Sequence, residues 1–275
     1  MMDLKSELIP TLLGQAQFPS FSPNLAMLQS CTDEEALYDL LFQAMEREPY
    51  LLAKFVTRAN SIAYGVPGEH FYSPRDCLNR VGLTEGLHIA LNFYLEDALG
   101  PYIRANSHCV ATWREARVAA QVSKHLSRLC TDDFRTGAAF LTSALSYVGE
   151  LFTLSVATTS ETRGINLGLY AEPKEGQVDV FHITGVIIGK LELPQTVGRQ
   201  FREIRKVVAG EAPFRANAGS VLLSRALAQS SQPLSAPVAQ VSPEAFESVV
   251  KEFGLAEDDL AHLVQEAQVT RQRLD

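Results

Sequence analysis

The sequence predicts an all-α protein made of two packed helical subdomains, an N-terminal one over about residues 1–105 and a second over about residues 106–275. Hydrophobic side chains recur every three or four residues along most of the chain, the spacing that gives a helix one apolar face. Serine, threonine or proline stands just before several of these stretches, where such residues cap or begin helices. No stretch shows the sustained alternation of polar and apolar residues that marks a half-buried strand.

Four helices are expected in the first subdomain. The first follows a capping box at Thr32 and keeps its apolar stripe to Met45, and the second continues to Gly65. The fourth ends at Gly100-Pro101, because glycine and proline both terminate helices. The four helices are expected to begin at Thr32, Pro49, Ser73 and Thr84.

The second subdomain is also predicted to be helical. Residues 113–129 keep helical spacing, and residues 134–156 are apolar on most sides, which indicates a central, buried helix. Residues 178–193 are predicted to be helical as well, although their β-branched cluster at residues 186–188 would by itself permit a strand. Pro194 is expected to begin the next helix.

Two segments of the second subdomain are predicted to be irregular. The glycines around residues 164–168 follow no predicted strand, so that we expect a loop between helices. Residues 229–241 are rich in serine, glutamine, proline and alanine and form the best candidate for a linker. Helix is expected to resume at Ser242-Pro243, and a last helical segment follows Leu255.

The composition is that of an ordinary globular protein. Of the 275 residues, 46% are hydrophobic and 20% are charged, which allows a substantial core without disulfides. The formal net charge of −8 disfavours broad binding to nucleic acid or to anionic membranes. No window approaches the ~20 apolar residues of a membrane-spanning helix, and the N-terminus lacks a signal-peptide pattern. We therefore expect a cytoplasmic location, with neither nucleic acid nor a membrane as a partner.

The most specific patterns lie in three groups of short segments. Residues 58–65 read Arg-Ala-Asn-Ser-Ile-Ala-Tyr-Gly and are followed by Ser-Pro-Arg-Asp-Cys-Leu at residues 73–78. Residues 139–151 read Ala-Phe-Leu-Thr-Ser-Ala-Leu-Ser-Tyr-Val-Gly-Glu-Leu. The third group is His-Ile-Thr-Gly-Val at residues 182–186, with Leu-Glu-Leu-Pro at residues 191–194.

These segments together resemble the HDOD family, the HD-related output domains of bacterial signalling proteins, over about residues 18–275. The resemblance implies an HD-like helical bundle and a stand-alone regulatory protein of signal transduction. Residues 139–151 are similar to the helix that reads Gly-Leu-Leu-His-Asp-Ile-Gly-Lys-Leu in metal-binding relatives, so that Ser146-Tyr147 takes the place of the His-Asp pair. Glu115 stands where those relatives supply a histidine, and His182 is the histidine that the resemblance retains.

The vestigial HD pocket is therefore expected to contain Glu115, Ser146, Tyr147 and His182, with no metal and no catalytic residue. An HD phosphohydrolase needs imidazole and carboxylate ligands that converge on a divalent metal, because the metal activates water and stabilises charge on the phosphate. A hydroxyl and a phenol are poor ligands for such a metal at neutral pH. The four cysteines lack Cys-x-x-Cys spacing and add no zinc site. No cofactor is expected.

Two alternatives stay open for this pocket. Glu115, Glu150 and His182 could meet as a small carboxylate and imidazole set, which would make the protein a metal-dependent phosphohydrolase of nucleotides or cyclic dinucleotides. The pocket could also bind such a nucleotide without cleaving it, as a sensor. The main hypothesis is a non-catalytic regulatory module that binds a signalling protein partner or a nucleotide-type small ligand.

Two further groups of polar side chains are candidates for ligand or partner binding. Arg58, Asn60 and Tyr64 lie close together at a helix end and offer a cation, an amide and a phenol to a phosphate or to a partner's backbone. The structural alternative is that Asn60 caps the end of the helix. Arg199 and Arg202 belong to a basic stripe that could bind an acidic ligand such as a cyclic dinucleotide, or form a solvated helix face.

Overall fold

The computed structural model confirms the all-α fold class. The residues that it describes are 22–65, 69–129, 136–156, 166–168, 177–190, 195–208, 211, 216–229, 250–251 and 253–274. They form two compact units that divide between Gly100 and Pro101, so that helix α6 (Leu83–Ile103) crosses the boundary. The sequence places this boundary after residue 105 instead.

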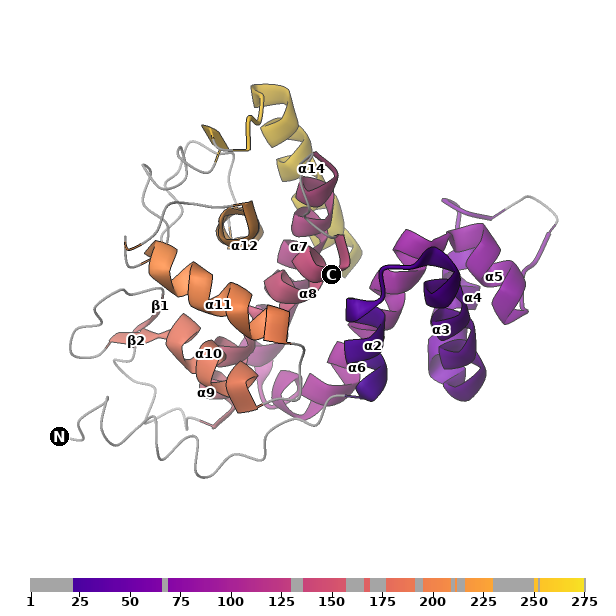
Figure 1. Cartoon of the computed structure of the whole chain (residues 1–275), viewed down its shortest axis with the longest axis horizontal. Helices are drawn as coiled ribbons and strands as arrows, with labels where there is room; N and C mark the ends of the chain where they lie inside the picture. The colour runs from indigo at the N-terminus through magenta and orange to yellow at the C-terminus, as the bar shows by residue number, and fades with distance from the viewer. Residues whose placement is uncertain are drawn as a thin grey trace. The chain divides into compact units, whose positions relative to one another are not determined.

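The N-terminal unit is a group of helices that proline residues help to begin. Its described elements are α2 (Pro23–Ser30), α3 (Glu34–Arg47), α4 (Pro49–Ala59), α5 (Pro74–Val81) and most of α6. Helices α3, α4 and α5 lie side by side and contact one another (Figure 1). Proline stands in the first turn of α2, α4 and α5, where its missing amide hydrogen leaves no helical bond unmade.

The first residues of these helices follow the predicted capping chemistry closely. Asp33, and not Thr32, caps α3, because its carboxylate accepts a hydrogen bond from the Ala36 amide at 2.8 Å. The expected start at Thr32 is corrected by this one position. Ser73 caps α5 as predicted, and its hydroxyl accepts from the Asp76 amide at 3.1 Å.

The predicted ends of two helices in this unit were wrong. Helix α4 ends at Ala59 and does not continue to Gly65, because Asn60 takes a non-helical conformation (φ −95°, ψ 5°) and turns follow it. Helix α6 continues through Gly100-Pro101 to Ile103. Proline removes a single amide hydrogen bond there, near the end of the helix, and the last turn tolerates the loss.

The core of the N-terminal unit is formed by apolar faces of its five described helices. A β-carbon at Gly86 of α6 would lie 3.0 Å from Leu78 Cδ1 and 3.2 Å from Phe55 Cε1, so that this glycine allows the close approach of α6. Fully buried side chains of this core include Leu41, Leu51, Phe55 and Leu91. The three- and four-residue spacing marks most of this core, although it puts Leu52 on the apolar stripe and the structure buries Leu51 instead.

The second unit is a larger set of helices arranged around one long helix. Its described helices are α7 (Ser107–Leu129), α8 (Thr136–Leu145), α9 (Val148–Val156), α10 (Val180–Lys190), α11 (Gln195–Val208), α12 (Ala216–Gln229) and α14 (Glu257–Leu274). Helix α7 contacts α8, α9, α12 and α14 (Figure 1). Helix α10 packs against α9 and α11.

The central buried helix predicted over residues 134–156 is divided into α8 and α9 by a turn at Ser146-Tyr147. The prediction of one continuous helix was therefore wrong. The Ser146 hydroxyl donates to the Ser143 carbonyl at 2.7 Å, and the Tyr147 amide bonds back to the Ala144 carbonyl, so that local side-chain bonding competes with the helix. The described side chains over residues 139–153 are all buried, as the sequence predicts.

A pair of short strands also departs from the predicted pattern. β1 (Asn166–Gly168) and β2 (Gln177–Asp179) pair in parallel. The predicted loop over residues 164–168 was thus wrong at 166–168, and the predicted helix over residues 178–193 begins only with α10. Asp179 separates strand from helix, because its carboxylate accepts a hydrogen bond from the Phe181 amide at 3.0 Å.

Some expectations fall outside the described residues. These are the helix start at Pro194, the helix start at Ser242-Pro243 and all of the linker over residues 229–241 except Gln229, which ends α12. Helix α14 confirms the predicted helical segment after Leu255. Among the described helices, each is too short or too polar to cross a membrane.

Candidate functional site

The candidate site is centred on the turn between α8 and α9, where the resemblance puts Ser146-Tyr147 in place of a His-Asp pair. Both side chains are completely buried. The sequence forms this turn because Ser146 bonds to its own preceding turn and Tyr147 supplies a large ring to the core. The turn thereby brings a backbone carbonyl, a hydroxyl and an aromatic face together in the interior of the second unit.

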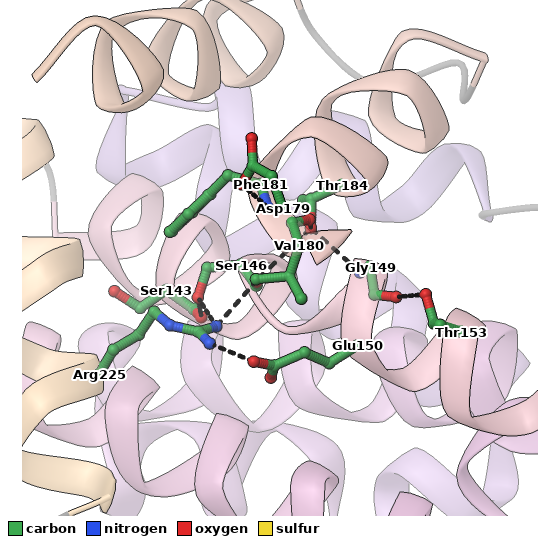
Figure 2. A network of polar contacts seen from close by, with 10 residues as sticks. All are labelled: Ser143, Ser146, Gly149, Glu150, Thr153, Asp179, Val180, Phe181, Thr184 and Arg225. Atoms are coloured by element: carbon green, nitrogen blue, oxygen red, sulfur yellow. Dashed lines mark hydrogen bonds and ion pairs between the residues drawn. The ribbon is translucent and has the colours of Figure 1, made fainter. Parts of the chain in front are cut away.

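Arg225 of α12 extends into this turn. Its side chain is 1% exposed, and Figure 2 shows its guanidinium reaching toward Ser146 and Glu150. Nη1 donates to the Ser146 carbonyl at 2.9 Å and contacts the Ser146 hydroxyl at 3.3 Å. Nη2 forms a 2.7 Å hydrogen-bonded ion pair with Glu150 Oε1, and Glu150 is itself buried. A charge-assisted bond of this length in a dry environment is among the stronger polar contacts of a protein.

Aromatic rings cover the same guanidinium. Its central carbon lies 3.8 Å from the centre of the Tyr147 ring and 5.4 Å from the centre of the Phe181 ring. A cation close to the face of an aromatic ring is stabilised by the ring's quadrupole, by about 2 kcal/mol when water is excluded. We call Arg225, Ser146, Tyr147, Glu150 and Phe181 the Arg225 cluster.

The electrostatics of the cluster keep Arg225 charged and Tyr147 neutral. Burial alone would lower the pKa of Arg225, but the nearby Glu150 carboxylate raises it above its ordinary value. Burial raises the pKa of the Tyr147 phenol far above its usual range, and the charge of Arg225 only partly opposes this shift. Tyr147 therefore contributes an aromatic face and no phenolate.

Glu115 of α7 lies within electrostatic reach of the cluster. Burial raises the pKa of its carboxyl group, the negative charge of Glu150 raises it further, and Arg225 opposes both. The Arg225 guanidinium thus interacts electrostatically with the carboxyl groups of both Glu115 and Glu150, and it forms a direct hydrogen bond with Glu150. Of the residues predicted for the vestigial pocket, Ser146 and Tyr147 are adjacent in the turn, and the charge of Glu115 acts on the Tyr147 phenol.

His182 has a different neighbour. It follows Phe181 on α10, and its charge and backbone amide act on Asp179, where burial raises the pKa of the carboxyl group and these contacts partly lower it. Arg205 lies 4.0 Å from Asp179 on another side. The principal charges that act on Tyr147 come instead from Arg225, Glu150, Glu115 and Arg271.

The residues of this site do not fit a divalent metal. Of the set Glu115, Glu150 and His182, the Glu150 carboxylate is already bonded to the Arg225 guanidinium, whose positive charge would repel a metal cation. Within the described parts of the chain, no group of three or more histidine, cysteine, aspartate or glutamate side chains is arranged to hold a metal ion.

Sequence reasoning missed Arg225, although its helix carries a recognisable signal. Residues 216–229 read Ala-Asn-Ala-Gly-Ser-Val-Leu-Leu-Ser-Arg-Ala-Leu-Ala-Gln, and Arg225 is the one charged residue among them. A single charge in an otherwise small and apolar helix indicates a buried ion that needs a partner. Glu150, considered from the sequence only as a metal ligand, is that partner.

In the N-terminal unit, the structure brings Arg58 and Tyr64 together. The Arg58 guanidinium carbon lies 4.8 Å from the centre of the Tyr64 ring, and Nη2 forms a 2.7 Å ion pair with Glu85. The backbone carbonyl of Tyr64 accepts a hydrogen bond from Arg80. Both side chains are thus engaged in contacts within their own unit.

Asn60 joins the end of α4 to the segment before α5. Its side-chain amide donates to the Val56 carbonyl at 2.8 Å and to the Phe71 carbonyl at 2.7 Å. Its side-chain oxygen accepts from the Phe71 amide at 2.9 Å. These three bonds match the structural alternative, in which Asn60 satisfies backbone groups at the end of a helix.

The basic stripe of α11 is exposed. Arg199 forms a 3.2 Å ion pair with Glu203 one turn further along, and Arg202 and Lys206 are exposed. Apolar side chains on the other face of the helix, Phe201 and Ile204, are buried. This is the pattern of an amphipathic surface helix.

A helical fold with a buried arginine cluster, at the turn where the resemblance puts Ser146-Tyr147 in place of a His-Asp pair, is the arrangement expected of an HDOD domain. The family model of the HDOD domain matches residues 19–168, and the chain belongs to this family. The match confirms the resemblance seen in the sequence, and it ends before α10.

Solved structures show the same fold. The chain is similar to a protein proposed to act in signal transduction from Marinobacter aquaeolei VT8, with 19% identity and a TM-score of 0.63, over 99% of this chain and 61% of that one. This chain therefore spans less than two thirds of the Marinobacter protein. It is also similar to an HDOD domain protein of unknown function from Geobacter sulfurreducens, with 14% identity and a TM-score of 0.65, over 99% of this chain and 98% of that one. No curated protein matches the chain.

Proposed function

We propose that this chain is a non-catalytic regulatory module of signal transduction that acts by binding a protein partner. One observation carries the proposal: the charged side chain of Arg225 is bonded to Glu150 and to Ser146, and the resemblance puts Ser146 in the place of a metal ligand of the HD proteins. The likeness to the Marinobacter protein, which is proposed to act in signal transduction, supports the regulatory role.

The chemistry of the Arg225 cluster argues against phosphate-ester hydrolysis. Such a reaction needs an activated water and a positive charge that contacts the phosphate. The Arg225 charge is 1% exposed and already paired with Glu150, so that it is not presented to a substrate. Metal-dependent hydrolysis remains the alternative function and is the one that the experiment below tests.

The same cluster supports a binding role. It links α12 to α9 and to the turn before it, and Phe181 of α10 lies near the same guanidinium, so that one buried side chain joins three helices of the second unit. Helices joined in this way would lose little conformational entropy on binding, which suits recognition of a partner. The proposal places this module in the bacterial cytoplasm, with a signalling protein as its partner and without nucleic acid, membrane or cofactor.

A nucleotide sensor without turnover is the second candidate. The exposed cations Arg202 and Lys206 on α11 favour it, since they are available to an acidic ligand. Arg58 and Tyr64 favour it less, because their side chains stack on each other and Arg58 pairs with Glu85.

The test of the proposal is an assay for turnover. Concentrated protein is incubated with manganese, magnesium or iron and a panel of cyclic dinucleotides and nucleoside phosphates, and products are followed by chromatography. We expect no product above a blank without protein. Turnover that disappears when Glu115 and His182 are both changed to alanine would contradict the proposal, whereas turnover that survives this change would identify a contaminating enzyme.

A further inference from the structure

A pocket of about 410 Å³ opens on the N-terminal unit, and none of its lining residues belongs to the Arg225 cluster. It is lined by two kinds of side chain, acidic and aromatic, together with one lysine and one serine. The lining residues are Ser22, Glu48, Tyr50, Lys54, Phe93, Tyr94, Glu96 and Asp97. A volume of this size accommodates a long side chain or a small ligand.

The pocket carries excess negative charge. Lys54 forms a 3.0 Å ion pair with Glu96, which offsets one of the three carboxylates. Glu48 and Asp97 have no ion-pair partner among the residues that the structure describes. Burial raises the pKa of the Tyr94 hydroxyl most, Glu48 and Asp97 raise it further, and Asn24 and Arg47 lower it. The charges of Glu48 and Asp97 therefore both act on Tyr94, which lines the pocket.

Aromatic rings supply the remaining walls. Phe93 and Tyr94 meet edge to face with ring centres 5.2 Å apart. Tyr94 is 3% exposed, and its hydroxyl is fixed by a 2.9 Å hydrogen bond from the Asn24 side chain. Tyr50 is 80% exposed, so that its ring is accessible to a ligand at the edge of the pocket.

We propose that this pocket receives a basic side chain, arginine in preference to lysine, from a protein partner. The proposal rests on the proposed function, in which the module binds such a partner, and it names the chemistry of the contact. A guanidinium stacks on an exposed aromatic ring and at the same time pairs with carboxylates, which is the combination that Tyr50, Glu48 and Asp97 offer. Its apolar stem fits against Phe93.

The exposure of the pocket favours a side chain of a partner over a free metabolite. Small-molecule sites usually bury most of their ligand, whereas Tyr50 is 80% exposed and Lys54 and Asp97 are exposed too. A side chain that projects from a folded partner can bind in a pocket that stays open on one side, because the partner itself covers that side. An exposed aromatic ring next to charges is also typical of the anchor positions of protein interfaces.

The experiment is an NMR titration of the isotope-labelled full chain, read at the backbone amides of Tyr50, Lys54, Phe93 and Asp97. The probe is the blocked peptide acetyl-Gly-Arg-Gly-amide. The matched control peptide replaces arginine by citrulline, which has the same shape and no charge. We expect saturable shifts with the arginine peptide, in the millimolar range, and affinity for the citrulline peptide lower by about tenfold. Free arginine should bind no better than the peptide.

Three variants test the walls of the pocket. Tyr50→Ala and Asp97→Asn should each weaken binding of the arginine peptide by about threefold to tenfold. Lys54→Met should strengthen it, because it removes a competing cation and its repulsion. Glu46→Gln, at an exposed carboxylate of α3 outside the pocket, is the control and should leave affinity within about twofold of the parent.

Equal binding of the arginine and citrulline peptides, tighter binding of free arginine, or no saturable shift at these amides would overturn the proposal. A loss of affinity in Glu46→Gln equal to that in Asp97→Asn would overturn it as well, because bulk charge alone would then explain binding. The outcome of this titration does not affect the assay for turnover. A result that contradicts the pocket proposal can therefore be distinguished from one that contradicts the proposed function.

Discussion

The guanidinium carbon of Arg225 lies 3.8 Å from the centre of the Tyr147 ring, and both side chains are withdrawn from water. Tyr147 stands where the resemblance puts the aspartate of the His-Asp pair, and we propose that an aromatic face and an internal cation take the place of a carboxylate and a metal. Glu150 balances the charge of that cation at 2.7 Å. The cluster thus keeps positive charge in the site without an exchangeable ion.

The ion pair between Arg225 and Glu150 should be strongly coupled. Removing one partner leaves a buried charge without compensation, so that Arg225→Met and Glu150→Gln should each lower the free energy of unfolding by about 3–5 kcal/mol. The double variant should lose less than the sum. Denaturant unfolding of the four proteins gives the coupling free energy, which we expect to be about 1–3 kcal/mol.

The exposed pair between Arg199 and Glu203 provides the matched control for this cycle. It joins the same types of charge at 3.2 Å on the surface of α11, where solvent screens the interaction. Its coupling should not exceed about 0.5 kcal/mol. Equal coupling in the two cycles would show that burial adds nothing to the Arg225 pair.

Gly149 should resist substitution because α9 and α10 meet there. A β-carbon at this position would lie 2.3 Å from the Val180 carbonyl oxygen, and the Gly149 amide donates to the Thr184 hydroxyl at 3.0 Å. Gly149→Ala should therefore destabilise the protein by about 1–3 kcal/mol. Gly185→Ala, in α10 with open space around the site, should instead be neutral or stabilising by up to about 1 kcal/mol. Thermal unfolding of both variants measures the two changes in stability. If both substitutions destabilised the protein, this explanation of Gly149 would be contradicted.

Asn60 should matter for stability through its three bonds to the backbone. Asn60→Ala leaves the Phe71 amide and the Val56 and Phe71 carbonyls without this partner, and the loss should be on the order of 1–2 kcal/mol. Asn79→Ala is the control, since Asn79 is exposed and accepts one 3.2 Å hydrogen bond from Tyr38. Coincident denaturation midpoints for the Asn60 variant and the parent would remove this structural role and leave ligand binding as the better explanation.

Glu115 should make stability depend on pH. Its carboxyl pKa is raised in the folded state, first by burial and then by Glu150, so that folding favours the protonated form. The resulting stability is present below the ordinary carboxyl pKa and is lost as pH rises through the raised value. Glu115→Gln mimics the protonated form and should be more stable than the parent at pH 7, with a difference that shrinks toward about pH 4. A difference that is constant with pH would contradict the shift.

The sequence was sufficient to predict the all-α fold class. Apolar spacing marked the buried faces, and capping residues such as Ser73 marked helix starts to within about one position. The division of residues 134–156 was missed, because the turn depends on a bond between Ser146 and Ser143 that periodicity does not register. The short strands were missed because three residues are too few to show alternation.

Arg225 was missed for a different reason. Its partners Ser146 and Glu150 are far from it in sequence, and only the packing of α12 against α8 brings them together. Sequence pattern could have indicated that a lone charge in an apolar helix needs a partner, but not which one. The resemblance assigns His182 to the pocket, and in the structure its charge and backbone amide act on Asp179, two residues after Gln177 of β2.

If the Arg225 guanidinium occupies the place of a divalent metal, the purified protein should hold none. Purified protein is incubated with excess iron, manganese or zinc, freed of unbound metal and subjected to elemental analysis. We expect no stoichiometric metal, because a second cation would meet the charge of Arg225 next to Glu150 and Ser146. About one tightly bound metal per chain, lost in a His182→Ala variant that remains folded, would contradict it.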